Sequence, residues 1–198
     1  MPWNLTPRTI ESECLQLVPL EISLLDEMCE ALLPDPNGWY QKMFGLTTRT
    51  LIEAEILESE KEERNGESLG FAFRDPKTGL IAGMSKFMRL DEENRHLEIG
   101  NTMIGPKFRR THVNSWAKFM MLKEAFEILR VGRVSFRIDE ENLISQRAVE
   151  RLGARLDGIL RNERILPDGR VRDYRFYSIV NAEWPTVKSA LSKKLEIS

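Results

Sequence analysis

Residues that cross-link small domains or bind metals are scarce in this sequence. Among its 198 residues there are only two cysteines, Cys14 and Cys29, and two histidines, His96 and His112. Two cysteines without a Cys-x-x-Cys pair cannot form a disulfide framework, and a zinc site needs three or four clustered ligands. We therefore predict no metal site and two reduced cysteines that pack inside the protein.

Long apolar runs are also absent. No stretch approaches the roughly 20 apolar residues that a membrane-spanning helix needs. The start, Met1-Pro2-Trp3-Asn4, lacks the basic stretch and apolar run of a signal peptide. We expect a cytoplasmic protein that does not contact a membrane.

An excess of charge of one sign is likewise missing. The chain has 29 basic and 31 acidic residues, and its formal net charge is −2. A nucleic-acid binder usually has a strongly basic domain, so no nucleic-acid partner is expected. Polyamines and basic peptides stay open, because a local acidic patch can exist in a chain of neutral total charge. The length and a hydrophobic fraction of 41% predict one globular domain over residues 1–198, with halves at about 1–90 and 91–198.

Strand and helix patterns follow one another in mixed order. Apolar residues that alternate indicate strands, and apolar residues three and four apart indicate helices. Strands are expected at 15–20, 69–73, 80–90, 96–103 and 134–138 and in a hairpin around Pro167-Asp168-Gly169 with a second arm at 171–179; helices are expected at 24–32, 48–61, 114–130, 142–152 and 183–195. This order predicts a mixed α/β fold whose sheet is antiparallel early and has a strand–helix–strand crossover later.

The clearest helix spans residues 114–130. Its apolar stripe consists of Phe119, Leu122, Phe126 and Leu129. Thr111 or Asn114 is expected to cap its start, and Gly132 to adopt the left-handed conformation beyond its end.

The common nucleotide, metal and hydrolase motifs are absent. There is no Gly-x-Gly-x-x-Gly, no Gly-x-x-x-x-Gly-Lys-Ser/Thr and no His-Glu-x-x-His. Gly83-Met84-Ser85-Lys86-Phe87 begins like a nucleophile elbow but lacks the closing glycine. None of these motifs therefore supports a phosphate loop, a nicotinamide site or a serine hydrolase.

An anion site is predicted where the clearest helix begins. A helix start offers unpaired backbone N–H groups and the positive end of the dipole. Arg109 and Arg110 lie just before it and add two guanidinium groups suited to phosphate oxygens. The alternative is a capped loop with exposed basic residues.

Several motifs of the C-terminal half occur together in one order. They are Leu97-Glu98-Ile99-Gly100, Arg110-Thr111-His112-Val113-Asn114, residues 142–154, Asp168-Gly169-Arg170-Val171-Arg172-Asp173 and Ser178-Ile179. With this order and spacing, the stretch from Leu97 to about Leu195 resembles the GCN5-related N-acetyltransferase (GNAT) superfamily. The branch it resembles is that of the ribosomal-protein-alanine N-acetyltransferases (RimJ/RimL-like). The N-terminal half resembles the superfamily only in its order of elements.

The resemblance implies a fold and an activity. The fold is a GNAT-like acyl-CoA N-acyltransferase fold, with a mostly antiparallel sheet, a splayed central pair of strands and flanking helices. The activity is transfer of an acetyl group from acetyl-CoA to a primary amine of a small molecule or a peptide N-terminus. A non-catalytic CoA-binding or interaction module is the alternative, and transfer of a bulkier acyl group would depend on the pocket around Met84, Met103 and Phe136. Homodimers are common among such proteins, but the sequence gives neither the oligomeric state nor the acceptor.

The resemblance also assigns residues to the cofactor. The pyrophosphate would lie on the loop and helix start formed by Arg109, Arg110, Thr111, His112, Val113 and Asn114. This loop lacks the glycines of the broad family pattern, Gln/Arg-x-x-Gly-x-Gly/Ala. A strand N–H near Thr102 or Met103, followed by Ile104, would face the oxyanion that develops during acyl transfer. Asn142 and Arg147 would contact the rest of the cofactor, although Asn142 is equally suited to cap a helix.

Two residues are candidates for the chemistry. The attacking amine must be neutral, and a carboxylate can accept its proton directly or through water. Glu98 lies on the strand before the cofactor loop, on the face opposite Leu97 and Ile99. It is either this base or a solvated strand residue. Ser145 matches a serine near the sulfur in this branch, or is simply the third residue of a helix; the tyrosine acid of many relatives has no counterpart between Tyr40 and Tyr174.

Three further groups have two interpretations each. The charged run 58–67 is a solvated helix end or an acidic lip beside a cationic substrate. Arg161, Arg172 and Asp173 beside the last hairpin are structural ion-pairing residues or part of a site. The aromatic residues Trp39, Tyr40 and Trp116 line an acceptor pocket or belong to the core.

Overall fold

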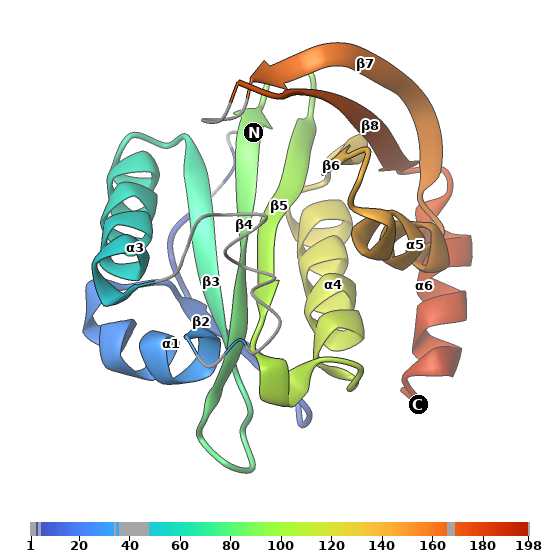
Figure 1. Cartoon of the computed structure of the whole chain (residues 1–198). Coiled ribbons are helices and arrows are strands. Elements are labelled where there is room, and N and C mark those ends of the chain that lie inside the picture. Colours follow the sequence, from blue (N-terminus) through green and yellow to red (C-terminus); the bar gives the residue numbers. More distant parts are fainter. Residues whose placement is uncertain (1–2, 4, 34, 36–47, 166–168, 198) are drawn as a thin grey trace.

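The computed structural model describes residues 3, 5–33, 35, 48–165 and 169–197 (Figure 1). An eight-stranded sheet runs through these residues in the order β1-β2-β3-β4-β5-β6-β8-β7. Its strands are β1 (Ile10–Glu11), β2 (Gln16–Pro19), β3 (Ser68–Arg74), β4 (Ile81–Asp91), β5 (His96–Ile104), β6 (Arg133–Asp139), β7 (Arg155–Ile165) and β8 (Val171–Val180). All neighbouring pairs are antiparallel except β5 and β6, which are parallel. The predicted mixed sheet with one crossover is confirmed.

Helices cover both faces of this sheet. They are α1 (Leu25–Leu32), α3 (Arg49–Arg64), α4 (Val113–Lys123), α5 (Leu143–Leu152) and α6 (Trp184–Lys194), with short 3₁₀ turns at Ile22–Leu24 and Pro106–Phe108. In Figure 1, α1 and α3 lie together at the N-terminal side of the sheet, and α4 lies beside the place where β5 and β6 meet.

Two apolar cores follow from the alternation of the strands. On β3, Phe71 and Phe73 pack into the core under α4 and α6, whereas Ala72 between them packs under α1 and α3. The buried core under α4 and α6 contains aliphatic and aromatic side chains, and the core under α1 and α3 contains aliphatic and sulfur-containing ones. Burial of such side chains is the main term that stabilises the fold. We call these two sides of the sheet the α4 face and the α3 face.

The helix that follows β5 differs in detail from its prediction. All four residues of the predicted apolar stripe are buried, but the helix changes from α-helix to π-helix over Glu124–Ile128. The expected left-handed residue is Arg130, with φ 56°, and not Gly132. The guanidinium group of Arg95 donates to the Arg130 carbonyl at 2.8 Å, which fixes the turn two residues earlier than expected.

The helix after β6 agrees with its prediction. The Asn142 side chain accepts a hydrogen bond from the Ser145 N–H and caps α5, and Gly153 ends it with φ 101°. A Cβ atom on Gly153 would lie 2.9 Å from a methyl group of Val187, so α6 can pack closely against this end. The turn expected at 34–38, except Asp35, and the Pro167-Asp168 tip of the last hairpin lie outside the described residues.

Candidate active site

The two central strands separate within the sheet. β5 and β6 pair only from His96 with Arg133 to Glu98 with Ser135. Beyond that point β5 stays paired with β4 as far as Ile104, and β6 stays paired with β8 as far as Asp139. The two strands therefore diverge directly after Glu98, as the predicted splayed pair requires.

Glu98 is buried where this divergence begins. Its side chain lies on the α3 face and is 7% exposed, with Oε2 3.2 Å from Nε of Arg89. Burial raises the pKa of Glu98 above its ordinary value, although the positive charges of Arg137 and Arg89 oppose that shift. Glu98 is thus not a solvated strand residue, and a raised carboxyl pKa makes it a stronger proton acceptor once it is ionised.

The space between Gly100 and its neighbours is filled by the side chains of Met88 and Glu98. A Cβ atom at Gly100 would lie 2.6 Å from Sδ of Met88 and 3.4 Å from Oε1 of Glu98. A larger residue at Gly100 would therefore require the Met88 side chain to move away from β5. The same Cβ atom would thus be close to both side chains, which shows that the space around Gly100 is filled on the side of Glu98.

The start of α4 is only partly capped by side chains. Its N-cap residue is His112, whose side chain makes no capping hydrogen bond. Of the two predicted caps, Asn114 lies inside the first turn and does not cap α4, whereas Thr111 accepts a hydrogen bond from the first N–H of the helix. Thr111 Oγ1 accepts from the Val113 N–H at 3.3 Å and satisfies one donor of the turn. A helix start with basic residues and without a full cap is suited to an anion.

The two arginines before α4 have different surroundings. Arg109 is partly buried, and it donates from Nη1 to Asp35 at 2.9 Å and from Nε to the Ile104 carbonyl at 3.3 Å. Arg110 is exposed and left-handed, with φ 62°. Arg109 therefore fixes the loop, and Arg110 is the guanidinium group that is accessible to a ligand.

The part of β5 that was predicted to face the oxyanion, around Thr102 and Met103, has a shifted register with β4. Thr102 is half-buried, and its hydroxyl accepts from Nζ of Lys118 at 2.5 Å. The Met103 side chain is fully buried among the residues under α1 and α3. Ile104 ends β5 and supplies the carbonyl that Arg109 contacts.

Across the divergence, α5 presents the remaining candidates. Asn142 is buried as the helix cap, so its structural role is established; its contact with a cofactor stays a prediction. Ser145 is half-buried in the first turn of α5, and Arg147 is exposed. All three lie on the strand–helix unit that begins with β6, on the other side of the divergence from Thr102.

The groups with two interpretations are now partly resolved. The charged run is mainly the exposed end of α3, but Glu62 turns inward to Lys86. Arg172 is ion-paired with Asp139 and Glu141 rather than with Asp173, which accepts the N–H of Asn162. Trp116 is half-buried and packs against the core, edge-on to Phe119 at a centroid distance of 6.1 Å. Trp39 and Tyr40 lie outside the described residues.

Two polar groups near the site are not evident from the sequence pattern. Lys118 is 4% exposed and lies on the apolar side of α4. Its position in the sequence could have indicated this burial, because the apolar residues Met121, Leu122 and Ala125 follow it at three, four and seven positions. Lys86 is 3% exposed within β4 and meets carboxylates of α3. A lysine between the apolar Met84 and Phe87 is a weak local sign of it.

The described ranges offer neither a metal cluster nor a membrane helix. These residues contain no group of three or more His, Cys, Asp or Glu side chains placed to hold a metal ion. None of the helices described there has both the length and the apolar character needed to cross a bilayer.

Comparisons with known proteins give a consistent result. A family model described as an acetyltransferase (GNAT) domain matches residues 15–155. A GCN5-related N-acetyltransferase from Brucella melitensis is 29% identical with a TM-score of 0.87, over 94% of this chain and 85% of that one. A protein of T. thermophilus assigned as an acetyltransferase is 32% identical with a TM-score of 0.84, over 98% and 100% of the two chains.

A more distant structure shares the fold. Mycobacterium smegmatis RimJ, solved in complex with CoA-disulfide, is 18% identical with a TM-score of 0.78, over 97% of this chain and 96% of that one. No curated protein sequence matches this chain. The predicted fold is confirmed by these structures.

Proposed function

Because the chain belongs to the GNAT acetyltransferase family, we propose that it acetylates a primary amine, either of a small molecule or of a protein N-terminus, by direct attack in a ternary complex. Family membership itself makes the protein an acetyl-CoA-dependent acetyltransferase. The non-catalytic alternative has no support among these relatives. The observation that carries the finer proposal is the buried Glu98 at the point where β5 and β6 diverge.

The residues before α4 fit the diphosphate of acetyl-CoA. Arg110 and His112 are exposed beside a helix start at which Thr111 satisfies one N–H group and the N-cap residue, His112, satisfies none through its side chain. Backbone N–H groups and a guanidinium group suit phosphate oxygens, and Arg109 holds the loop through Asp35. The bound thioester supplies an activated acetyl group, and the N–H groups near Thr102 and Met103 are proposed to face its carbonyl oxygen.

Glu98 is proposed as the proton acceptor. At neutral pH an α-amino group, with a pKa near 8, is roughly one-tenth neutral, whereas a lysine side chain, with a pKa near 10.4, is neutral in less than about one molecule in a thousand. Burial of Glu98 raises its pKa, so that the proton affinities of carboxylate and amine lie closer together. A protein N-terminus or a small amine of low pKa is therefore favoured over a lysine side chain.

The packing favours acetyl over a bulkier acyl group. Met84, Met103 and Phe136 are 1%, 0% and 2% exposed, and their side chains fill the two cores. Moving them would open cavities in close-packed regions. On the other side of the divergence, Ser145 is proposed to lie near the thiolate that leaves, whose parent thiol has a pKa near 8.5.

The proposal is tested with acetyl-CoA and a panel of amines. The panel contains peptides with a free N-terminus, the same peptides with a blocked N-terminus and one lysine, and polyamines. Release of the CoA thiol and the mass of the product report transfer. We expect transfer to at least one free amino group; thiol release without an acetylated product, or no binding of acetyl-CoA by calorimetry at millimolar concentration, would contradict the proposal.

A further inference from the structure

One irregularity of β5 lies beside the proposed reaction centre. Across the β4–β5 ladder, Met84 pairs with Met103 and Lys86 pairs with Gly100. One residue of β4, Ser85, therefore faces two residues of β5, Asn101 and Thr102, which is a β-bulge. Asn101 has φ 49°, in the left-handed region where asparagine is tolerated better than most residues.

The bulge changes which side of the sheet each residue faces. Before it, Leu97 and Ile99 lie on the α4 face; after it, Met103 lies on the α3 face, although all three positions are odd-numbered. The backbone of Asn101 and Thr102 is thus turned relative to a regular strand. Such a conformation persists only where surrounding contacts hold it.

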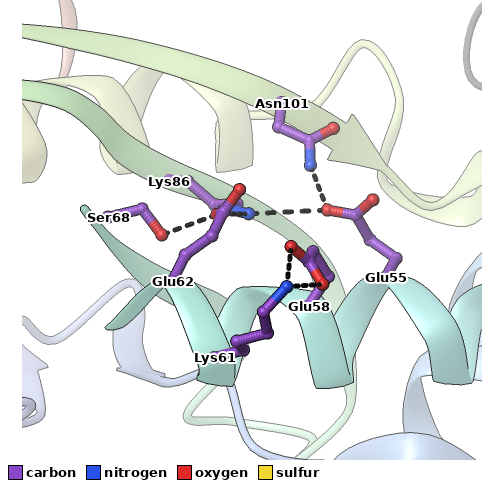
Figure 2. A network of polar contacts seen from close by, with 7 residues as sticks. All are labelled: Glu55, Glu58, Lys61, Glu62, Ser68, Lys86 and Asn101. Atoms are coloured by element: carbon purple, nitrogen blue, oxygen red, sulfur yellow. Dashed lines mark hydrogen bonds and ion pairs between the residues drawn. The ribbon is translucent and has the colours of Figure 1, made fainter. Parts of the chain in front are cut away.

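A charged network holds the bulge on the α3 face (Figure 2). Asn101 Nδ2 donates to Glu55 Oε1 at 2.5 Å, and Lys86 Nζ lies 3.7 Å from the same oxygen. Lys86 also donates to Glu62 Oε2 at 2.5 Å, which accepts from Ser68 Oγ at 2.8 Å. The Glu55 carboxylate is therefore ion-paired with the buried Lys86 and accepts a hydrogen bond from Asn101 in the bulge.

A second network, in which Lys118 donates to neutral hydroxyl groups, holds the bulge on the α4 face. Lys118 Nζ donates to Thr102 Oγ1 at 2.5 Å and to Ser85 Oγ at 3.1 Å. The two hydroxyl oxygens are 2.8 Å apart, and Ser85 Oγ donates to the Gly100 carbonyl at 2.9 Å. These bonds connect α4, whose start is the proposed diphosphate site, to both ends of the bulge.

We propose that Glu55 and Lys118 are positioning residues that clamp the Asn101–Thr102 bulge from opposite faces of the sheet and so aim its backbone N–H groups for acyl transfer. The inference rests on the proposed function for its catalytic part. The clamp itself is a property of the protein without any ligand. Neither residue has to touch the substrate, because each acts through a side chain of the bulge.

The first readout is backbone hydrogen exchange of Asn101 and Thr102, measured by NMR on the free protein. Each clamp supplies at least one hydrogen bond that is at least partly buried, so Glu55→Ala and Lys118→Met should each raise the exchange rates roughly tenfold. Two matched controls lie on the same helices. Glu58→Ala removes a carboxylate that is paired with Lys61 and does not reach the bulge, and Lys123→Met removes an exposed lysine of α4; both should leave these rates unchanged.

The second readout is steady-state kinetics. A misplaced backbone N–H group of the bulge lowers the rate of the chemical step more than it weakens substrate binding. In Glu55→Ala and Lys118→Met, kcat should therefore fall roughly 10- to 100-fold, and KM for acetyl-CoA should stay nearly constant. Glu55→Gln keeps an oxygen that can accept from Asn101 and should restore most of the activity.

The outcomes separate the clamp from the proposed function. Unchanged exchange at the bulge in both variants would overturn the clamp, whatever the activity. A Glu55→Gln enzyme as slow as Glu55→Ala, with normal exchange, would overturn positioning and indicate proton transfer by Glu55. If the unaltered protein acetylated no amine, the proposed function would fail, and the exchange rates would still decide whether Glu55 and Lys118 hold the bulge.

Discussion

Two buried lysines flank the same bulge of β5, but their partners differ. Lys86, on the α3 face, lies between the carboxylates of Glu55 and Glu62. Lys118, on the α4 face, donates to the hydroxyl groups of Ser85 and Thr102. One network is therefore ionic and the other is built from neutral acceptors.

The difference shows how a protein can bury an amine in two ways. An ammonium group beside carboxylates keeps its charge compensated, and removing either partner leaves an unpaired charge. An ammonium group among hydroxyls has no such compensation, and burial lowers the pKa of Lys118 from 10.5 to about 7. The first arrangement stabilises the fold through pairing; the second allows the amine to be neutral near physiological pH.

The largest effect on stability is expected for Lys86→Met. The variant leaves Glu55 and Glu62, each about three-quarters buried in its side chain, without their cation. Breaking a fully buried pair costs roughly 3–5 kcal/mol, and partial solvent access reduces this to about 2 kcal/mol. Urea denaturation at pH 7 measures the loss. A variant as stable as the original protein would contradict the stabilising role of the ion pairs of Lys86 with Glu55 and Glu62.

Lys118→Met is expected to act in the opposite direction. Methionine has nearly the same shape and carries no charge into the α4 core, so the variant should be about 1 kcal/mol more stable at pH 6. Its activity should nevertheless fall, as the clamp requires. A large loss of stability would place Lys118 in the same class as Lys86.

The pH dependence sharpens this contrast. Between pH 7 and 10.5 the unfolded chain holds the Lys118 proton that the folded protein has released, so the stability of the original protein rises with pH. The free-energy difference between Lys118→Met and the original protein should therefore move by roughly 2–3 kcal/mol in favour of the original protein between pH 6 and pH 9, which reverses the advantage of the variant. Parallel denaturation series of the two proteins measure it, and a constant difference would contradict the lowered pKa.

A smaller effect is expected for Ser68→Ala. Burial alone would raise the pKa of Glu62, but hydrogen bonds from Lys86 and Ser68 outweigh it, and the pKa lies below the ordinary value. Loss of the Ser68 donor should cost about 1 kcal/mol at pH 7. Because a lowered carboxyl pKa stabilises the fold above pH 4.5, this difference should disappear as Glu62 becomes protonated in acid. If the loss of stability in Ser68→Ala persisted at acid pH, Ser68 would stabilise the fold by contacts other than its hydrogen bond to the ionised Glu62.

The regular parts of the fold could be predicted from local patterns. The apolar stripe of α4, the Asn142 cap and the left-handed Gly153 each depend on residues within a few positions of one another. Periods of two and of three to four residues carry such information directly.

The irregular parts depend on distant contacts. Asn101 meets Glu55 across 46 positions, and Arg109 meets Asp35 across 74. The left-handed Arg130 depends on Arg95, which lies 35 positions earlier. The alternation of β5 could not show that it breaks at Asn101, nor that Glu98 is buried, because both facts depend on what α3, α4 and β4 place against the strand.

The proposed chemistry depends most on Glu98 as the proton acceptor. The direct measurement is the pH–rate profile of Glu98→Gln beside that of the unaltered enzyme, with one amine at a saturating concentration and acetyl-CoA varied at each pH. We expect kcat to fall about 100-fold or more, KM for acetyl-CoA to stay nearly constant, and the acidic limb set by the raised pKa of Glu98 to vanish. A variant with the same profile and a kcat within about twofold of the original would show that another group, or water alone, takes the proton.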